Sequence, residues 1–209
     1  MDLIPTLADT IKELTLSFDD IPSERKKLLE QLAHFIKEKV ALNKTVYLVF
    51  ICTHNSRRSH MAQIWAQAAA AYYTIDNVEC YSGGTEATAF YPAAVKAMNM
   101  LGFSIMQEKE EKNPTYQIRF SAEQAPFSVW SKRFDDPANP ASGFCAVMTC
   151  TDADENCPFI PGAEKRLALP YQDPKTSDNT ATQAKIYEER ARQIGREMLY
   201  TFSLVEVYI

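Results

Sequence analysis

Hydrophobic and polar residues alternate along the chain in patterns that predict strands and helices in turn. Short, nearly continuous apolar runs bounded by polar residues are typical of buried strands. These runs are residues 46–51, 78–82, 144–149 and 166–169. Apolar residues at three- and four-residue spacing predict helices, and they cover residues 59–73, 91–100 and 182–200. Alternation of this kind implies an α/β fold, with a four-stranded parallel sheet and helices on both faces.

An N-terminal segment precedes this alternating part of the chain. Residues 1–45 carry apolar side chains at helical spacing, which predicts a short helix and then a long amphipathic helix beginning at Ser23. We place the domain with the alternating pattern at residues 46–209. The apolar faces of the two helices are expected to pack on that domain or on a partner subunit, so a homo-oligomer fits the pattern.

A polar insertion interrupts the alternating pattern at about residues 107–143. Within it, residues 116–120 and 127–130 alternate between apolar and polar, which predicts a β-hairpin. The hairpin either lies near a functional site as a lid or interface, or is a decorative addition at an edge of the sheet, without a role at the site. We favour the second, decorative role.

Composition and charge exclude several classes of partner. The chain has 209 residues and a net charge of −5, with no basic stripe, so nucleic acid is not an expected partner. It shows no signal peptide and no apolar run of membrane length. We therefore expect a cytoplasmic protein of one α/β domain with elaborations, without a membrane partner.

The end of the first predicted strand carries the candidate chemistry. Cys52 closes the strand, Arg58 follows after five residues, Ser59 comes next, and a helix begins there. The intervening loop consists of Thr53, His54, Asn55, Ser56 and Arg57. Backbone N–H groups of such a loop, together with a helix N-terminus, bind anions and favour the thiolate of a cysteine. The guanidinium of Arg58 can hold two oxygens of a tetrahedral anion, and Ser59 can donate a hydrogen bond to the sulfur. The alternative, a buried structural cysteine, explains neither the spacing nor the context.

These residues resemble the phosphate-binding loop of the low-molecular-weight protein tyrosine phosphatase superfamily, which carries Cys-x5-Arg-Ser/Thr and includes the thioredoxin-coupled arsenate reductases. The resemblance continues in residues 82–103, which are similar to the second strand and helix of the reductases, and in residues 147–158, which are similar to their redox segment. Asp173, followed by proline, matches the general-acid position of the family. The resemblance implies that Cys52, Arg58, Ser59 and Asp173 are catalytic.

The same resemblance implies a relay of three thiols. Cys52 attacks arsenate while Asp173 protonates the departing oxygen, and Cys150 then releases arsenite by forming a disulfide with Cys52. Cys157 attacks Cys150 in turn, and thioredoxin reduces the resulting disulfide. Acidic residues between Cys150 and Cys157 favour a solvated, mobile loop there. No metal or cofactor is implied, and the substrate is arsenate or a phosphate-like oxyanion.

Two other functions stay open. In a low-molecular-weight phosphatase, Cys150 and Cys157 would protect Cys52 by reversible oxidation. A non-catalytic oxyanion-binding regulatory protein would need neither thiolate nor acid. The cysteine pair does not have zinc-site spacing, and an intracellular chain disfavours a static disulfide. Lys175, Thr176 and Ser177 stand where phosphatases of the family carry aromatic residues, which favours a small inorganic oxyanion as the substrate.

Several neighbouring residues carry separate expectations. His54 stands where relatives often have glycine, so a positive φ there would be costly. Arg57 adds positive charge beside the loop, and His60 is expected to face solvent. Cys80 and Cys145 lie inside apolar strand runs, and we interpret both as core packing residues.

Overall fold

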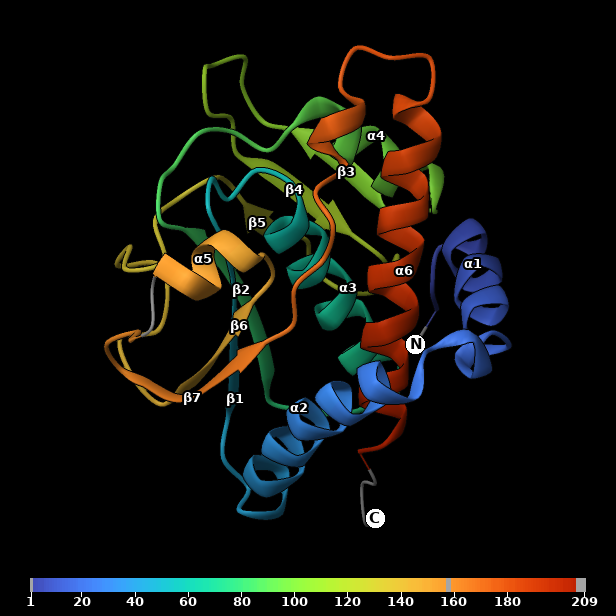
Figure 1. The fold of residues 1–209 in the computed structure, drawn as a ribbon. Coiled ribbons are helices and arrows are strands. Elements are labelled where there is room, and N and C mark those ends of the chain that lie inside the picture. The colour runs from blue at the N-terminus through green and yellow to red at the C-terminus, as the bar shows by residue number, and fades with distance from the viewer. Residues whose placement is uncertain (1, 157–158, 206–209) are drawn as a thin grey trace.

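The computed structural model describes residues 2–156 and 159–205 and contains the predicted parallel sheet (Figure 1). Its four strands lie in the order β2-β1-β6-β7, and every neighbouring pair is parallel. The strands are β1 (Val46–Cys52), β2 (Val78–Gly84), β6 (Phe144–Met148) and β7 (Ala163–Ala168). The four predicted strands are confirmed, with ends that shift by a few residues. Because β1 is an interior strand, the residue that ends it lies at the middle of the carboxyl edge of the sheet.

Most helices cover one face of the sheet. They are α1 (Pro5–Thr15), α2 (Ser23–Ala41), α3 (Arg58–Tyr72), α4 (Pro92–Met100) and α6 (Gln183–Ser203). The short α5 (Thr151–Asn156) lies on the other face, where it packs on β1 and β6 (Figure 1). The large core therefore lies between the sheet and the five helices, and a smaller one lies beneath α5.

Close packing of α3 against α6 explains why α3 is rich in alanine. Six alanines lie between Ala62 and Ala71, and five of them are buried. Gly195 of α6 lies against the indole of Trp65, where an added Cβ would come within 2.6 Å of the ring. Small residues thus let the two helices approach closely. This contact fixes α3, and with it the end of the loop that follows β1.

The N-terminal helices pack on the sheet domain, as one of the two sequence-based expectations states. Both α1 and α2 contact α6, and α2 also packs on β1 and β7. Arg25 of α2 forms an ion pair with the buried Glu197 of α6 at 2.8 Å, and its guanidinium lies over the Tyr171 ring. The boundary at residue 45 stays a prediction.

The insertion forms more than the predicted hairpin. Strands β4 (Tyr116–Arg119) and β5 (Phe127–Val129) pair antiparallel, and β3 (Ser104–Gln107), which the sequence did not indicate, adds a third strand. The chain that follows β5 reaches the loop after β1. Ser131 Oγ donates to the carbonyl of His54 at 3.1 Å, and the N–H of Lys132 donates to Asn55 Oδ1 at 2.8 Å. The decorative role was therefore wrong, because this segment supports the candidate loop.

The segment after β6 also differs from the expectation. Residues 151–156 form α5 rather than a solvated loop. Acidic residues in the first turn favour a helix N-terminus, because they face its positive end. The acidic side chains there thus stabilise a helix, and Arg166 of β7 pairs with Asp154 at 2.5 Å. Among the described residues, no helix is both long and apolar enough to cross a bilayer.

Candidate active site

The loop between β1 and α3 forms around one residue in the left-handed region. Asn55 has φ +43°, whereas His54 does not have a positive φ. Asparagine tolerates this conformation better than most residues, so the strain expected at His54 does not arise. Gly84 at the end of β2 packs against the loop, where an added Cβ would lie 2.7 Å from both the Asn55 nitrogen and the Thr53 oxygen. Only glycine allows the loop to lie this close to β2.

Cys52 and Ser59 meet across this loop, as the sequence predicts. Cys52 Sγ lies 3.1 Å from Ser59 Oγ, and Ser59 Oγ accepts a hydrogen bond from Asn55 Nδ2 at 2.9 Å. The Asn55 amide is oriented by the N–H of Lys132, which can only donate to its oxygen. Because the Asn55 amide occupies Ser59 Oγ as acceptor, the Ser59 hydroxyl proton is available to the sulfur of Cys52. Ser59 can therefore donate a hydrogen bond to the Cys52 sulfur.

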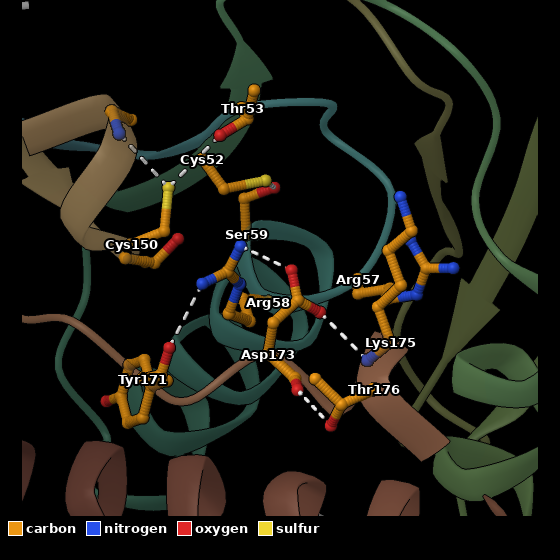
Figure 2. A network of polar contacts seen from close by, with 12 residues as sticks. Cys52, Thr53, Arg57, Arg58, Ser59, Cys150, Tyr171, Asp173, Lys175 and Thr176 are labelled. Carbon is orange, nitrogen blue, oxygen red and sulfur yellow. Dashed lines mark hydrogen bonds and ion pairs between the residues drawn. The ribbon is translucent and has the colours of Figure 1, made fainter. Parts of the chain in front are cut away.

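Arg58 brings Asp173 to the loop from a distant part of the chain. Its Nη2 donates to Asp173 Oδ2 at 2.6 Å, and its Nη1 donates to the Tyr171 carbonyl at 3.0 Å (Figure 2). Asp173 precedes the 3-10 helix Pro174–Ser177 and accepts the N–H of Lys175 at 3.0 Å. The Asp-Pro turn therefore positions the Asp173 carboxylate beside the Arg58 guanidinium, which the sequence predicts to bind the oxyanion.

Cys150 also lies next to this loop, beside Thr53 and Cys52 (Figure 2). Its Sγ is 3.5 Å from Thr53 Oγ1 and accepts the Ala153 N–H at 3.4 Å. Cys52 and Cys150 belong to one buried apolar cluster beneath α5. Since β6 neighbours β1 in the sheet, residues just beyond the two strand ends come together. Cys157 lies outside the described residues.

The remaining loop side chains point elsewhere. Arg57 Nε donates to the Tyr187 hydroxyl at 2.6 Å, Nη2 pairs with Asp178 at 2.7 Å, and the guanidinium lies over the Tyr91 ring. The sequence held no signal for these partners, which come from two distant segments. Ser56 Oγ donates to the Ala89 carbonyl at 2.7 Å, and His54 Nε2 lies 3.8 Å from the Glu86 carboxylate at the rim. The side chains of Arg57 and Ser56 thus hold the loop in place.

The two other described cysteines, Cys80 and Cys145, lie in the core and away from the loop. Burial raises the pKa of the Cys145 thiol to about 12 and raises that of Cys80 even more, so both are poor nucleophiles. Both are buried in the core, as predicted. Among residues 2–156 and 159–205, no group of three His, Cys, Asp or Glu side chains could hold a metal ion.

His60 lies beneath the loop rather than in solvent, so that expectation was wrong. Its ring is fully buried, 4.4 Å from the Phe90 ring, and its Nδ1 lies 3.2 Å from Ser82 Oγ. Burial lowers the pKa of His60 well below its ordinary value, and the positive charge of Lys132 lowers it further. The folded protein therefore holds this imidazole neutral.

We expect the neutral His60 to make stability fall with acidity. Below about pH 6.5 the unfolded chain binds a proton at His60 and the folded chain does not, so the free energy of unfolding decreases by about 1.4 kcal/mol per pH unit. Urea unfolding at pH 7.5 and 5.5 measures this effect, which should total about 1.4 kcal/mol between the two values because His60 of the unfolded chain titrates near pH 6.5. His60→Asn should remove it, whereas His34→Asn, at an exposed helix position, should keep it. An unchanged slope in His60→Asn would contradict the assignment.

Known proteins share parts of this sequence and this fold. A family model described as low molecular weight phosphotyrosine protein phosphatase matches residues 47–113. An arsenate reductase of Bacillus subtilis is 33% identical over 157 residues, which make up 75% of this chain and 93% of that protein. An arsenate reductase 2 of Staphylococcus epidermidis is 34% identical over 134 residues, or 63% and 79% of the two chains. A low-molecular-weight phosphotyrosine phosphatase from Vibrio cholerae shares the fold with a TM-score of 0.50 and 14% identity, over 74% and 93% of the chains.

Proposed function

Because the chain belongs to the low-molecular-weight protein tyrosine phosphatase superfamily and is similar to its arsenate reductases, we propose that it reduces arsenate to arsenite through a Cys52 adduct. The relatives make it an enzyme, an arsenate reductase or a phosphatase, with an oxyanion as substrate. The observation that favours reduction is the position of Cys150. Its sulfur lies 3.5 Å from the Thr53 hydroxyl, beside the residue that would carry the adduct. Hydrolysis requires no second thiol there.

The first step joins sulfur to arsenic. The Cys52 thiolate attacks arsenate, an As–S bond forms, and an As–O bond breaks. Asp173 supplies the proton with which that oxygen leaves as water. Arg58 holds the remaining oxygens together with the loop N–H groups. Since Asp173 already accepts from Arg58 at 2.6 Å, an oxyanion competes with Asp173 for the guanidinium. Anion binding would thereby release the carboxylate, which takes up a proton from solvent and delivers it to the leaving oxygen.

The second step moves two electrons to arsenic. The Cys150 thiolate attacks Cys52 Sγ, the S–S bond forms, and the electron pair of the S–As bond stays on arsenic, which leaves as arsenite. Cys157 then attacks Cys150 and regenerates the Cys52 thiolate. The dithiol of thioredoxin reduces the final disulfide and supplies the electrons of the cycle.

The relay requires α5 to unwind, because the Cys150 sulfur accepts the N–H of Ala153 within this helix at 3.4 Å and has to leave that contact to pair with another thiol. With Cys150 fully buried in the structure, unwinding would also expose its sulfur to thioredoxin. The helix is short, with only six residues, and short helices are marginal by themselves.

The proposal is tested by arsenite release from arsenate, driven by thioredoxin, thioredoxin reductase and NADPH. Steady release over many turnovers is the expected result. The alternative function is phosphomonoester hydrolysis through a phospho-cysteine on Cys52, which the match of residues 47–113 to the phosphatase model favours. Hydrolysis of para-nitrophenyl phosphate without arsenite release would establish that alternative. An oxyanion that binds without any turnover would indicate a regulatory protein.

Arg58→Lys should lower kcat/KM about 10²–10³-fold, the range found when one donor to a developing oxyanion is removed. Lysine cannot hold two oxygens in one plane or reach both Asp173 and the Tyr171 carbonyl. Steady-state kinetics and competition by inorganic phosphate measure the loss. The matched control is Arg57→Lys, whose guanidinium pairs with Asp178 and Tyr187. It should destabilise the fold more than it weakens anion binding. Equal kinetics for Arg58→Lys and wild type would locate the anion elsewhere.

Asp173→Asn should slow adduct formation about 10²–10⁴-fold, as expected when a general acid is lost. Asparagine keeps the acceptor for the Lys175 N–H but cannot protonate the leaving oxygen. Rapid-quench measurement of the first turnover tests this step. Para-nitrophenyl phosphate provides an internal control, because its leaving group departs without protonation and should suffer a smaller loss than phenyl phosphate. Equal losses on the two esters would argue against proton donation by Asp173.

A further inference from the structure

A cavity of about 310 Å³ lies along the outer edge of β2. One wall comes from α3 and β2, and the other from the chain between Phe120 and Ala138. None of residues 52–59 lines it, so it is separate from the candidate active site. Ligand sites of small molecules start at roughly this size.

The cavity is not a groove for an added strand. β2 is an edge strand of the parallel sheet, and such edges can pair with extended peptides. Here two amide side chains already occupy the outward backbone groups. Gln63 donates to the Cys80 carbonyl at 2.9 Å, while Gln67 donates to the Val78 carbonyl at 3.0 Å and accepts the Cys80 N–H at 3.0 Å. The edge is therefore closed to further backbone pairing.

Lys132 gives the cavity an unusual charge. The residue is only 4% exposed, and its Nζ lies 4.4 Å from the centre of the Trp130 ring. No hydrogen bond or ion pair joins this ammonium group to any other described residue, whereas buried charges in proteins are normally paired. Burial lowers the pKa of Lys132 to about 8, and the more distant charge of Asp136 offsets part of that effect. A desolvated cation of this kind gains much from an anionic partner.

We propose that this cavity binds a small monocarboxylate, with its carboxylate on the Lys132 ammonium and its apolar body against the aromatic rings of the lining. Those rings belong to Trp130, Phe120 and Phe127. Glu79 also lines the cavity; it is exposed, and its carboxylate accepts from the Tyr81 hydroxyl. Its negative charge disfavours a phosphate or other dianion and selects a singly charged ligand.

Titration with sodium benzoate, followed by tryptophan fluorescence, tests the proposal. The chain has two tryptophans, and Trp65 is fully buried in the core, so a ligand on Trp130 changes the signal of one known residue. Inorganic phosphate is kept in excess to occupy the candidate active site. A saturable change with benzoate is expected, and neutral benzamide should bind at least about tenfold more weakly, because it cannot form the charged hydrogen bond.

Two variants locate the binding site. Lys132→Met keeps the length of the stem and should weaken benzoate binding at least about tenfold, while Lys37→Met, an exposed lysine of α2, should bind as wild type does. Ser128→Phe, at an exposed lining position, should block the cavity without touching Lys132, and circular dichroism checks that each variant folds. Equal binding of benzamide, unchanged affinity in Lys132→Met, or no saturable change in wild type would each overturn the proposal.

Discussion

Replacing Cys52 by serine should abolish both arsenate reduction and phosphomonoester hydrolysis, with a loss of at least about 10⁴-fold, comparable to removal of a catalytic nucleophile elsewhere. The Cys52 sulfur is the nucleophile of both proposed activities, and it lies 3.1 Å from the Ser59 hydroxyl, which can donate a hydrogen bond to it. A serine hydroxyl at position 52 stays protonated and is a far weaker nucleophile, and the loop supplies no base to activate it.

Turnover of arsenate and of para-nitrophenyl phosphate measures this effect. The variant should still bind phosphate, because Arg58 and the loop N–H groups remain, and isothermal titration checks that binding. Cys145→Ala is the matched control, since this buried core cysteine should lose stability but not activity. Substantial turnover in Cys52→Ser would refute the assignment of the nucleophile, and with it both candidate activities.

Replacing Cys150 by serine should stop arsenite release entirely while leaving para-nitrophenyl phosphate hydrolysis in place. Without a second thiol, the arsenic adduct on Cys52 has no reductant, because the electron pair must come from formation of a disulfide. Serine is close in size to cysteine, so the contact with Thr53 is retained in shape. The adduct should therefore accumulate, and mass spectrometry of the quenched protein detects it.

Cys157→Ser should behave differently, and the contrast tests the order of the relay. Cys150 can still attack Cys52, so about one arsenite per chain should be released before the protein stalls as a Cys52–Cys150 disulfide. Cys80→Ala should sustain full turnover, because Cys80 is a core residue of β2. Continued turnover in Cys150→Ser would remove the relay and favour the phosphatase function. Equal arsenite yields from the two serine variants would contradict the proposed order.

Local sequence patterns predicted most of the fold. The strands and long helices follow from the periodicity of apolar residues, which is a property of neighbouring positions. Two short elements, β3 and α5, were not predicted by this periodicity. β3 has only four residues and depends on pairing with β4. The acidic segment of α5 has the composition of a solvated loop, and its helical state depends on packing beneath it and on the contact between Asp154 and Arg166.

The candidate site was predicted in part. The spacing of Cys52, Arg58 and Ser59 places all three where one strand ends and the next helix begins. Their proximity therefore follows from residues that are close in the sequence. The placement of Asp173 and Cys150 beside the loop rested on the family resemblance, and in the structure both lie there. What each loop side chain contacts could not be predicted, as His60 shows. It was expected in solvent and is fully buried.

By itself, the sequence determined the α/β class and the family and predicted an anion-binding loop, because these rest on periodicity and on spacing within short segments. Only the tertiary structure decided that the insertion supports the loop through Ser131 and Lys132, that Arg57 clamps the loop to α6 through Tyr187, and that Lys132 lies buried beside a cavity. The three loop contacts, made by Ser131, Lys132 and Tyr187, join residues separated by 77 to 130 positions in the chain. Such contacts depend on how the helices and the two sheets pack in space, and no local pattern encodes that packing.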